Sequence, residues 1–338
     1  MTDNISRLLL YPFENNLLQS NQEDRCLIIN DSKTLLNGFF LSIDQLTFDY
    51  SVTVDNSQSV QNIPENEEYN YIFYVLPKNK RESLYYLSVA TKHLKKDGYI
   101  VAVAANDAGG KTLSKVMNQV GFKGESYSKN KCRIFVGQVA GVNDEFINDN
   151  LKIGVPHLVS INCEEFYTQV GIYGWDKIDL GSKILIQTLP ENLSGVGADF
   201  GCGYGYIAKK ICEKNNKLSK FICIDIDWRS IECAKLNLKP YDEKVDLDYL
   251  WADLTQKPEG LTPLDFIVMN PPFHKGKETK IDLGRQMIKT AHSRLKNGGK
   301  LYIVANRQLP YEAVLNDLFR KVEKVNEEQG FKVFHVQK

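Results

Sequence analysis

The fold is decided by the stretch Phe266-Ile267-Val268-Met269-Asn270-Pro271-Pro272-Phe273, an apolar run that ends in two consecutive prolines. The apolar run predicts a buried strand. The prolines remove two backbone N–H donors and fix two φ angles, so the strand has to end there. Asn270 and the strand's last carbonyls then offer oxygen acceptors beside the flat ring of Phe273. This combination suits a planar amino group such as that of a nucleobase, and a plain strand-ending turn is the alternative.

The same plan occurs twice in the chain. Residues 71–106 and 265–306 each read as an apolar strand ended by proline, an amphipathic helix, a glycine-containing stop and a second strand that closes on Ala-Asn. The helices are expected at 81–94 and 283–295, and the glycines that follow are typical of helix ends. Alternating strands and helices predict parallel sheets covered by helices on both faces. The predicted fold class is therefore α/β, with two tandem Rossmann-like domains that arose by duplication.

The first copy lacks the features that would bind a ligand. Where the second copy has a Gly-rich loop, the first has residues 27–33, which contain no glycine. Where the second has Asn270 to Phe273, the first has Leu76-Pro77-Lys78-Asn79. We therefore expect a degenerate domain at 1–150 and a functional domain at 151–338, joined by the Gly- and Pro-containing chain near 141–156.

Composition indicates an ordinary globular protein. The chain has 338 residues, 43% apolar and 25% charged, with a net charge of zero. It shows no apolar run of about 18 residues and no N-terminal signal pattern, so we predict a cytoplasmic protein that does not enter a membrane. The seven cysteines are scattered without CxxC pairs or zinc-ligand spacing. They predict reduced thiols, no disulfide framework and no structural metal.

Basic residues are clustered in two segments. Residues 78–133 contain 12 basic and 4 acidic side chains, and residues 275–300 contain 8 basic and 2 acidic ones. Such clusters are often solvated helix faces. The second cluster, however, begins just after Phe273, where a polyanion would have to dock, and we expect phosphate contacts there.

A Gly-rich loop follows the first strand of the second copy. Glycines at 201, 203 and 205 allow a tight turn and a close approach of a ligand to the main chain. A nicotinamide dinucleotide site is the rival interpretation. The spacing here is GxGxG, not GxGxxG, and Asp199 precedes the loop, where it would repel a pyrophosphate and suit an ammonium group. These details favour S-adenosylmethionine as the cofactor.

Acidic residues end the next two strands. Asp225 closes the run Phe221 to Ile224 and is placed to accept the two ribose hydroxyls. Asp227 is expected to cap the following helix. Asp253 ends a third strand and is placed for the adenine amino group, with an exposed loop acid as the alternative. Asn270 ends the fourth strand, so each of these strand ends presents a suitable polar group.

These motifs resemble those of the class I S-adenosylmethionine-dependent amino methyltransferases. A narrower resemblance is to the RsmC type of ribosomal RNA guanine-N2 methyltransferase, strong over residues 165–338 and only architectural over 1–150. The strings that support it are Asn270-Pro271-Pro272-Phe273-His274, Val304-Ala305-Asn306 and Leu309-Pro310-Tyr311, together with the degenerate first copy. The resemblance implies that the first domain supports folding and RNA recognition and that the substrate is a guanine of 16S ribosomal RNA.

The expected catalytic set is the string from Asn270 through Pro271, Pro272 and Phe273 to His274. Asn270 and the Pro271 carbonyl would each accept one proton of the guanine amine and turn its lone pair toward the methyl group. Phe273 would stack on the extruded base. His274 would either move the departing proton or orient the loop. The family resemblance also makes residues 166–179 a cover for the cofactor.

We expect a monomer that acts on 16S ribosomal RNA or the small ribosomal subunit, with no metal. A guanine of the large ribosomal subunit, a DNA adenine or a protein glutamine would suit the same Asn-Pro-Pro chemistry. A protein of another class, an RNA-binding assembly factor without turnover, would not need an intact cofactor loop with Asp225 in place.

Overall fold

The computed structural model describes residues 5–52, 59–60, 63–215, 217–258, 260–272 and 277–338. The chain divides into two compact units, Met1–Val155 (unit 1) and Pro156–Lys338 (unit 2). The division lies close to the boundary expected at 150/151. In the part of the chain that the structure describes, no helix is long and apolar enough to cross a membrane.

Unit 2 is a mixed sheet whose strands follow the order β12-β11-β10-β13-β14-β16-β15. Strands β12, β11, β10, β13 and β14 pair with one another in parallel, whereas β16 is antiparallel to both β14 and β15. The bounds are β10 (Ser194–Phe200), β11 (Lys217–Asp225), β12 (Asp246–Trp251), β13 (Leu264–Met269), β14 (Leu295–Asn306), β15 (Lys321–Glu328) and β16 (Phe331–Gln337).

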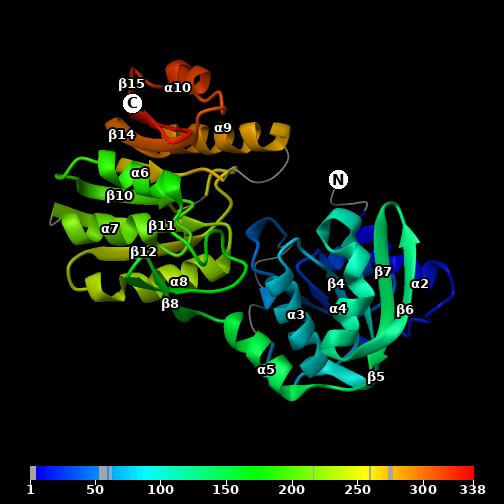
Figure 1. Cartoon of the computed structure of the whole chain (residues 1–338). Coiled ribbons are helices and arrows are strands. Elements are labelled where there is room, and N and C mark those ends of the chain that lie inside the picture. Colours follow the sequence, from blue (N-terminus) through cyan, green and yellow to red (C-terminus); the bar gives the residue numbers. More distant parts are fainter. Residues whose placement is uncertain (1–4, 53–58, 61–62, 216, 259, 273–276) are drawn as a thin grey trace. The chain divides into compact units, whose positions relative to one another are not determined.

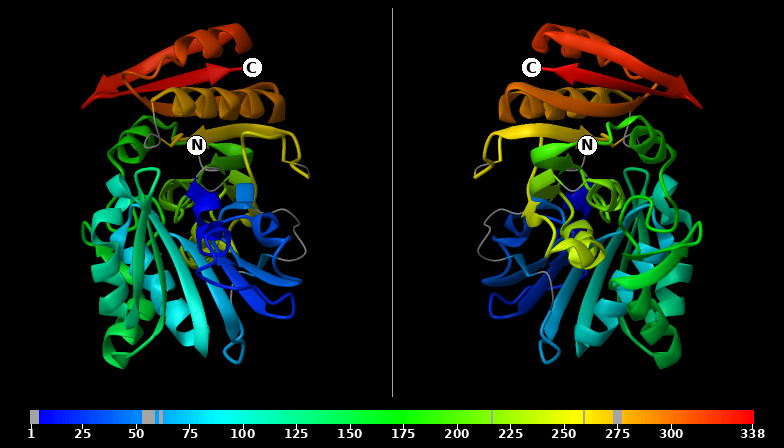
Figure 2. Two further views of the ribbon diagram at one scale, coloured as in Figure 1. Left: turned by 90° about the vertical axis from the view of Figure 1, so that its right-hand side faces the viewer. Right: turned by 90° about the vertical axis from the view of Figure 1, so that its left-hand side faces the viewer.

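Helices cover both faces of this sheet, and each face has its own apolar core (Figure 1). On one face pack α6 (Leu180–Thr188), α7 (Tyr206–Lys214) and α8 (Trp228–Leu238), and on the other α9 (Lys277–Arg294) and α10 (Glu312–Leu318). Figure 2 shows the layers of each unit from two further sides. A separate hairpin, β8 (His157–Ile161) and β9 (Glu164–Thr168), and the short turn η6 (Lys239–Tyr241) complete the unit.

Unit 1 has the same strand order, β3-β2-β1-β4-β5-β7-β6. Its strands are β1 (Arg25–Ile29), β2 (Ser42–Leu46), β3 (Ser59–Val60), β4 (Tyr69–Val75), β5 (Leu94–Ala105), β6 (Phe122–Lys129) and β7 (Cys132–Val139). Its helices are α2 (Tyr11–Glu14), α3 (Lys80–His93), α4 (Leu113–Val120) and α5 (Asp144–Ile153), with short turns η1 (Arg7–Leu10), η2 (Lys33–Leu36), η3 (Tyr50–Val52), η4 (Asn106–Ala108) and η5 (Gly110–Thr112). The shared order confirms the predicted α/β fold in two copies. The expectation of parallel sheets was wrong at one edge of each, because β7 in unit 1 and β16 in unit 2 are antiparallel to both of their neighbours.

One backbone hydrogen bond aligns the two copies. Gly201 N donates to Ile224 O at 2.8 Å in unit 2, and Asn30 N donates to Leu46 O at 2.8 Å in unit 1. Counting along the paired strands from this bond places Ile28 at the position of Asp199 and Thr47 at that of Asp225. Unit 1 therefore has the same turn after its first strand but lacks the counterparts of the Asp199 and Asp225 carboxylates.

The same alignment corrects one expectation. Tyr74 pairs with Ile29 as Met269 pairs with Phe200, so the counterpart of Asn270 is Val75. The prediction that the string beginning at Leu76 occupies this place was wrong by one residue. The backbone explains the difference, because Leu76 N donates to Val103 O at 2.8 Å and its counterpart Pro271 has no N–H to donate.

The glycines after α3 and α9 serve a purpose other than the one predicted. The helices end at His93 and Arg294, and the next residue of each already pairs with the preceding strand. Gly98 and Gly299 lie four to five residues further on, where the register shifts. A Cβ on Gly98 would lie 2.9 Å from the carbonyl oxygen of Asn70. Close backbone approach, not a helix stop, requires glycine there.

All seven cysteines lie in the described residues and are unpaired. Cys163 is exposed and the others are buried. Burial raises the pKa of Cys212 to about 12, so this thiol is protonated at neutral pH. The described residues contain no group of three or more His, Cys, Asp or Glu side chains that could hold a metal ion.

Gly98→Ala is expected to destabilise unit 1 by about 1–3 kcal/mol, since backbone oxygens cannot move aside for the added methyl group. Gly38→Ala is the matched control, because nothing lies within 4 Å of a Cβ built there. Urea denaturation of both variants measures the difference. Equal stability of the two variants would show that the strand register tolerates a side chain at residue 98.

Candidate active site

Four polar residues meet at one edge of the unit 2 sheet. Strands β12, β11, β10 and β13 are adjacent and parallel, so their carboxyl ends lie side by side. Asp199 lies near the end of β10, Asp225 closes β11, Asp253 follows β12 and Asn270 follows β13. All four were expected from the sequence, and the sheet topology brings them to this edge. Ligands of open α/β sheets bind at such edges.

The Gly-rich loop connects β10 to α7 through three left-handed residues. The φ angles are 83° at Gly201, 54° at Gly203 and 87° at Gly205. A Cβ on Gly203 would meet nothing within 4 Å, so this glycine borders open space. A Cβ on Gly205 would lie 3.2 Å from Ala234 of α8, so Gly205 permits close helix packing. The loop thus combines an exposed main chain with a tightly packed support.

Asp225 braces this loop. Its carboxylate accepts hydrogen bonds from Gly203 N at 2.8 Å and from Asp227 N at 2.9 Å. Burial raises the pKa of Asp225 to about 7, and the Asp227 N–H opposes this rise by favouring the charged form. An ionised carboxylate has about four acceptor sites, so Asp225 can accept hydrogen bonds from a ligand in addition to these two backbone N–H groups.

Asp199 is fully buried, and among the described residues neither of its carboxylate oxygens has a partner that meets ordinary hydrogen-bond geometry, the Ala208 N–H included. Burial raises the pKa of Asp199 to about 8, and the charge of Asp225 raises it further, whereas the backbone N–H of Ala208 acts in the opposite direction. Buried carboxyl groups without partners are costly. A cation or an N–H donor from a ligand would remove this cost.

Asp227 caps α8, as predicted. Its side chain accepts from Arg229 N at 2.9 Å and forms an ion pair with the Arg229 guanidinium at 2.6 Å. A Cβ on Gly171 would lie 2.0 Å from that guanidinium, so the arginine packs directly against the segment before α6. The cap therefore also anchors this segment.

Asp253 is buried and forms a tight turn. Its Oδ1 accepts from the backbone N of Thr255 at 2.8 Å and from the Thr255 hydroxyl at 2.7 Å. Oδ2 has a weaker contact with Gln256 Nε2 at 3.4 Å. This geometry leaves Oδ2 with the capacity to accept another hydrogen bond.

The segment before α6 packs on the Gly-rich loop. Ile172 and Phe166 share an apolar cluster with Tyr204 of the loop, and the Phe166 and Tyr204 rings are 5.4 Å apart. Asn237 of α8 ties the two together, because its Nδ2 donates to the carbonyls of Tyr167 and Tyr204 at 2.8 Å each. Residues 166–179 therefore lie beside the candidate cofactor loop.

Asn270 is held by two acceptors. Its Nδ2 donates to Asp179 Oδ2 at 2.7 Å and to Ser182 Oγ at 2.8 Å. Pro271 is buried and Pro272 is exposed. The other two members of the expected catalytic set, Phe273 and His274, lie outside the described residues.

The contributions of Asp179 and Asn237 were not expected from the sequence. An acid three residues before Ser182 predicts a helix cap, and Asp179 is one, since it accepts from Ser182 N at 2.9 Å. Its contact with Asn270, 91 residues away, has no local signal. Asn237 likewise bonds to a segment 70 residues away, and only the fold brings them together.

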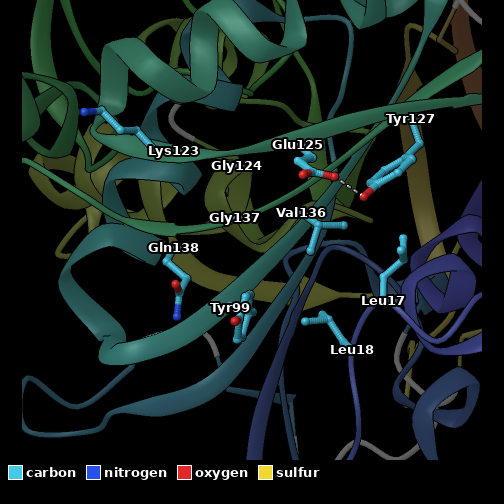
Figure 3. A pocket seen from close by; sticks show the side chains of 10 residues that line it. All are labelled: Leu17, Leu18, Tyr99, Lys123, Gly124, Glu125, Tyr127, Val136, Gly137 and Gln138. Atoms are coloured by element: carbon cyan, nitrogen blue, oxygen red, sulfur yellow. Dashed lines mark hydrogen bonds between the residues drawn. The ribbon is translucent and has the colours of Figure 1, made fainter.

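Unit 1 has a shallow hollow of its own (Figure 3). It is formed by β6, β7, Tyr99 of β5 and the residues after α2, and the Tyr127 hydroxyl donates to Glu125 inside it at 2.5 Å. Tyr99 lies in the first half of β5 (Leu94–Ala105), whereas the candidate site of unit 2 lies at carboxyl ends of strands. The hollow is therefore not a counterpart of that site.

Two protein-family models match this chain. Residues 164–335 match the family described as "Methyltransferase small domain", and residues 18–151 match the one described as "Methyltransferase small domain N-terminal". The chain belongs to the small-domain methyltransferases. The predicted enzyme class is thereby confirmed, and so is the resemblance inferred from the motifs.

Curated proteins that are similar in sequence to this methyltransferase are also named as methyltransferases. It is 30% identical over 279 residues to "Ribosomal RNA small subunit methyltransferase C" of Shewanella sediminis, covering 80% of this chain and 78% of that protein. It is 30% identical over 271 residues to the protein of the same name from Photorhabdus laumondii, covering 79% and 76%.

A solved structure shows the same fold. This is the T. thermophilus 16S rRNA N2 methyltransferase RsmC in complex with AdoMet and guanosine, at a TM-score of 0.79 and 17% identity. The match covers 99% of this chain and 92% of that one, so both units of the methyltransferase have counterparts there.

Asp199→Asn is expected to stabilise the ligand-free methyltransferase, and increasingly so as the pH rises. The pKa of Asp199 is raised to about 8 in the folded protein, above its ordinary value of about 4. Folding therefore takes up a proton between these values, and the free energy of unfolding of the wild type falls as the pH rises through this range. The variant cannot ionise, so its advantage grows as the pH rises and is on the order of several kcal/mol near pH 8.

Denaturation of wild type and variant at about pH 5, 6.5 and 8 measures this trend. A difference that stays constant over this range would mean that residue 199 does not titrate in the folded protein.

Proposed function

We propose that this protein transfers a methyl group from S-adenosylmethionine to the exocyclic N2 amine of a guanine in small-subunit ribosomal RNA. It acts as a monomer in the cytoplasm, with 16S ribosomal RNA or the small subunit as its partner. The observation that supports this most directly is the fixed amide of Asn270, beside Pro271, at the edge where Asp199, Asp225 and the Gly-rich loop meet.

The residues present fit S-adenosylmethionine. The cofactor supplies an electrophilic methyl group on a sulfonium. Asp225 would accept the ribose hydroxyls, and the open main chain at Gly203 would permit close approach. Asp199 has two unsatisfied oxygens and suits the ammonium group, directly or through a water molecule. Asp253 Oδ2, whose contact with Gln256 Nε2 is 3.4 Å long, would accept from the adenine amino group.

Asn270 and Pro271 would orient the target amine. The lone pair of a guanine amine is delocalised into the ring, so the amine is a weak nucleophile. Asn270 Oδ1 and the Pro271 carbonyl would each accept one amine proton and thereby direct the lone pair toward the methyl group. No strong base is needed before transfer, since the methylated amine loses its proton readily. We propose that Phe273 stacks on the base and that Pro272 and His274 complete the loop.

Unit 1 is proposed to recognise RNA through a basic edge. Lys78 follows β4, Lys111 follows β5, and Lys131 and Arg133 lie at the β6–β7 hairpin, all exposed. Asn106 N donates to Lys131 O at 2.9 Å, which fixes the hairpin tip at the end of β5. These residues share the carboxyl edge of the sheet. Lys78 Nζ pairs with Asp107 Oδ2 at 3.0 Å, and the charges of the other three suit phosphate groups.

Methyl transfer to purified ribosomal RNA tests the function. The protein is incubated with S-adenosylmethionine and, in separate reactions, with small subunits, large subunits, DNA or total protein from cells that lack the gene, and the digested products are analysed by mass spectrometry. One N2-methylguanine in small-subunit RNA is the expected product. A methylated large-subunit guanine, adenine or protein would identify one of the alternative targets instead, and RNA binding without transfer would indicate an assembly factor.

Asn270→Ala is expected to lower the rate of methyl transfer by at least about 100-fold, because the target amine loses its acceptor. The dissociation constant of S-adenosylmethionine should stay within a few-fold of the wild-type value. Asp225→Ala is the contrasting variant and should weaken cofactor binding. Retained turnover in Asn270→Ala would remove Asn270 from the mechanism, and calorimetry with both variants separates binding from chemistry.

A further inference from the structure

The orientation of the Asn270 amide is determined by its partners. An ionised carboxylate can only accept hydrogen bonds, so the Asn270 atom 2.7 Å from Asp179 Oδ2 has to be the amide nitrogen. The second N–H of this nitrogen points to Ser182 Oγ at 2.8 Å. Both donors are therefore used inside the protein. Oδ1, on the other side of the amide, is the atom left for a substrate.

Asp179 is itself held from three directions. Its Oδ2 accepts from Ser182 N at 2.9 Å and from the Ser182 hydroxyl at 3.3 Å, and its Oδ1 accepts from the Tyr173 hydroxyl at 3.1 Å. These partners come from the start of α6 and from the segment that packs on the Gly-rich loop. Asn270 at the tip of β13 is the remaining partner. One carboxylate thus joins the helix, the cover segment and the strand end.

A helix cap alone does not require this arrangement. Serine and asparagine cap helices about as well as aspartate. A serine at residue 179 could accept from Ser182 N, but its shorter side chain would not reach Asn270. A substitution at residue 179 can therefore keep the cap of α6 while removing the contact that orients the Asn270 amide.

We propose that Asp179, assisted by Ser182, is a positioning residue for methyl transfer that acts through the Asn270 amide. It keeps Asn270 Oδ1 directed at the guanine amine. If the Asn270 amide were rotated by 180°, it would present N–H donors to this amine, which is itself a donor. The carboxylate also polarises the amide and makes Oδ1 a stronger acceptor. As the amine attacks the methyl group, positive charge develops on its nitrogen, and the more negative oxygen stabilises this charge. This inference rests on the proposed function of Asn270.

The experiment is a double-mutant cycle with Asp179→Ser and Asn270→Ala, measured as single-turnover methyl transfer with labelled S-adenosylmethionine at saturating RNA. In the wild-type background Asp179→Ser is expected to lower the rate on the order of 30- to 100-fold, with the RNA KM and the cofactor dissociation constant changed less than about 3-fold. In the Asn270→Ala background the same substitution is expected to change the rate less than about 3-fold.

Two further variants isolate the role of the carboxylate. Asp179→Asn keeps the cap and offers a neutral acceptor to Asn270, so it should recover at least about tenfold of the rate lost in Asp179→Ser. Asn143→Ala is the matched control, because Asn143 caps α5 of unit 1 by accepting from Phe146 N at 3.1 Å. Its transfer rate should equal that of the wild type even though a cap is lost.

The outcomes are distinct. Equal rate losses from Asp179→Ser in both backgrounds would overturn the proposal, and so would an unchanged rate in the wild-type background. A wild-type protein that transfers no methyl group to small-subunit RNA would instead refute the proposed function, before any variant is compared.

Discussion

The site depends on a pair of hydrogen bonds in which Gly201 and Cys202 both donate to the carbonyl of Ile224, at 2.8 and 3.0 Å. These bonds fold the loop after β10 back onto the end of β11. They place Asp225 beside Gly203, and the N–H of Gly203 then bonds to the Asp225 carboxylate. The loop, the acid and the start of α7 are thus one connected unit, which needs left-handed residues that only glycine adopts at low cost.

Much of this arrangement could be predicted from sequence. The apolar runs ending in Asp225 and Asn270 mark strand ends, and parallel pairing then requires these side chains to share an edge. The glycine spacing predicted the loop, and Asp227 predicted the cap of α8. Such features are local, so each is visible within about ten residues of sequence.

The features that sequence could not provide are those that depend on approach in space. Gly98 and Gly299 resembled helix-ending glycines, because the local sequence pattern does not distinguish a helix cap from a glycine needed for close backbone contact. The bond from Asn270 to Asp179 joins residues 91 positions apart and has no periodicity to reveal it. The strand register was likewise needed to show that Val75 is the counterpart of Asn270. From sequence alone, the two proline-ended strands can be aligned equally well with Leu76 at that position.

The difference between the two units has an evolutionary consequence. In unit 1 the position of Asp199 is filled by Ile28, a fully buried residue of the apolar core. An aspartate there would leave a carboxyl group without partners, at a cost of several kcal/mol, unless a ligand and its other contacts were already present. Thr47, Asn30 and Val75 would also have to change before any of these substitutions brought an advantage. A site like that of unit 2 could therefore not arise in unit 1 by any one of these substitutions alone.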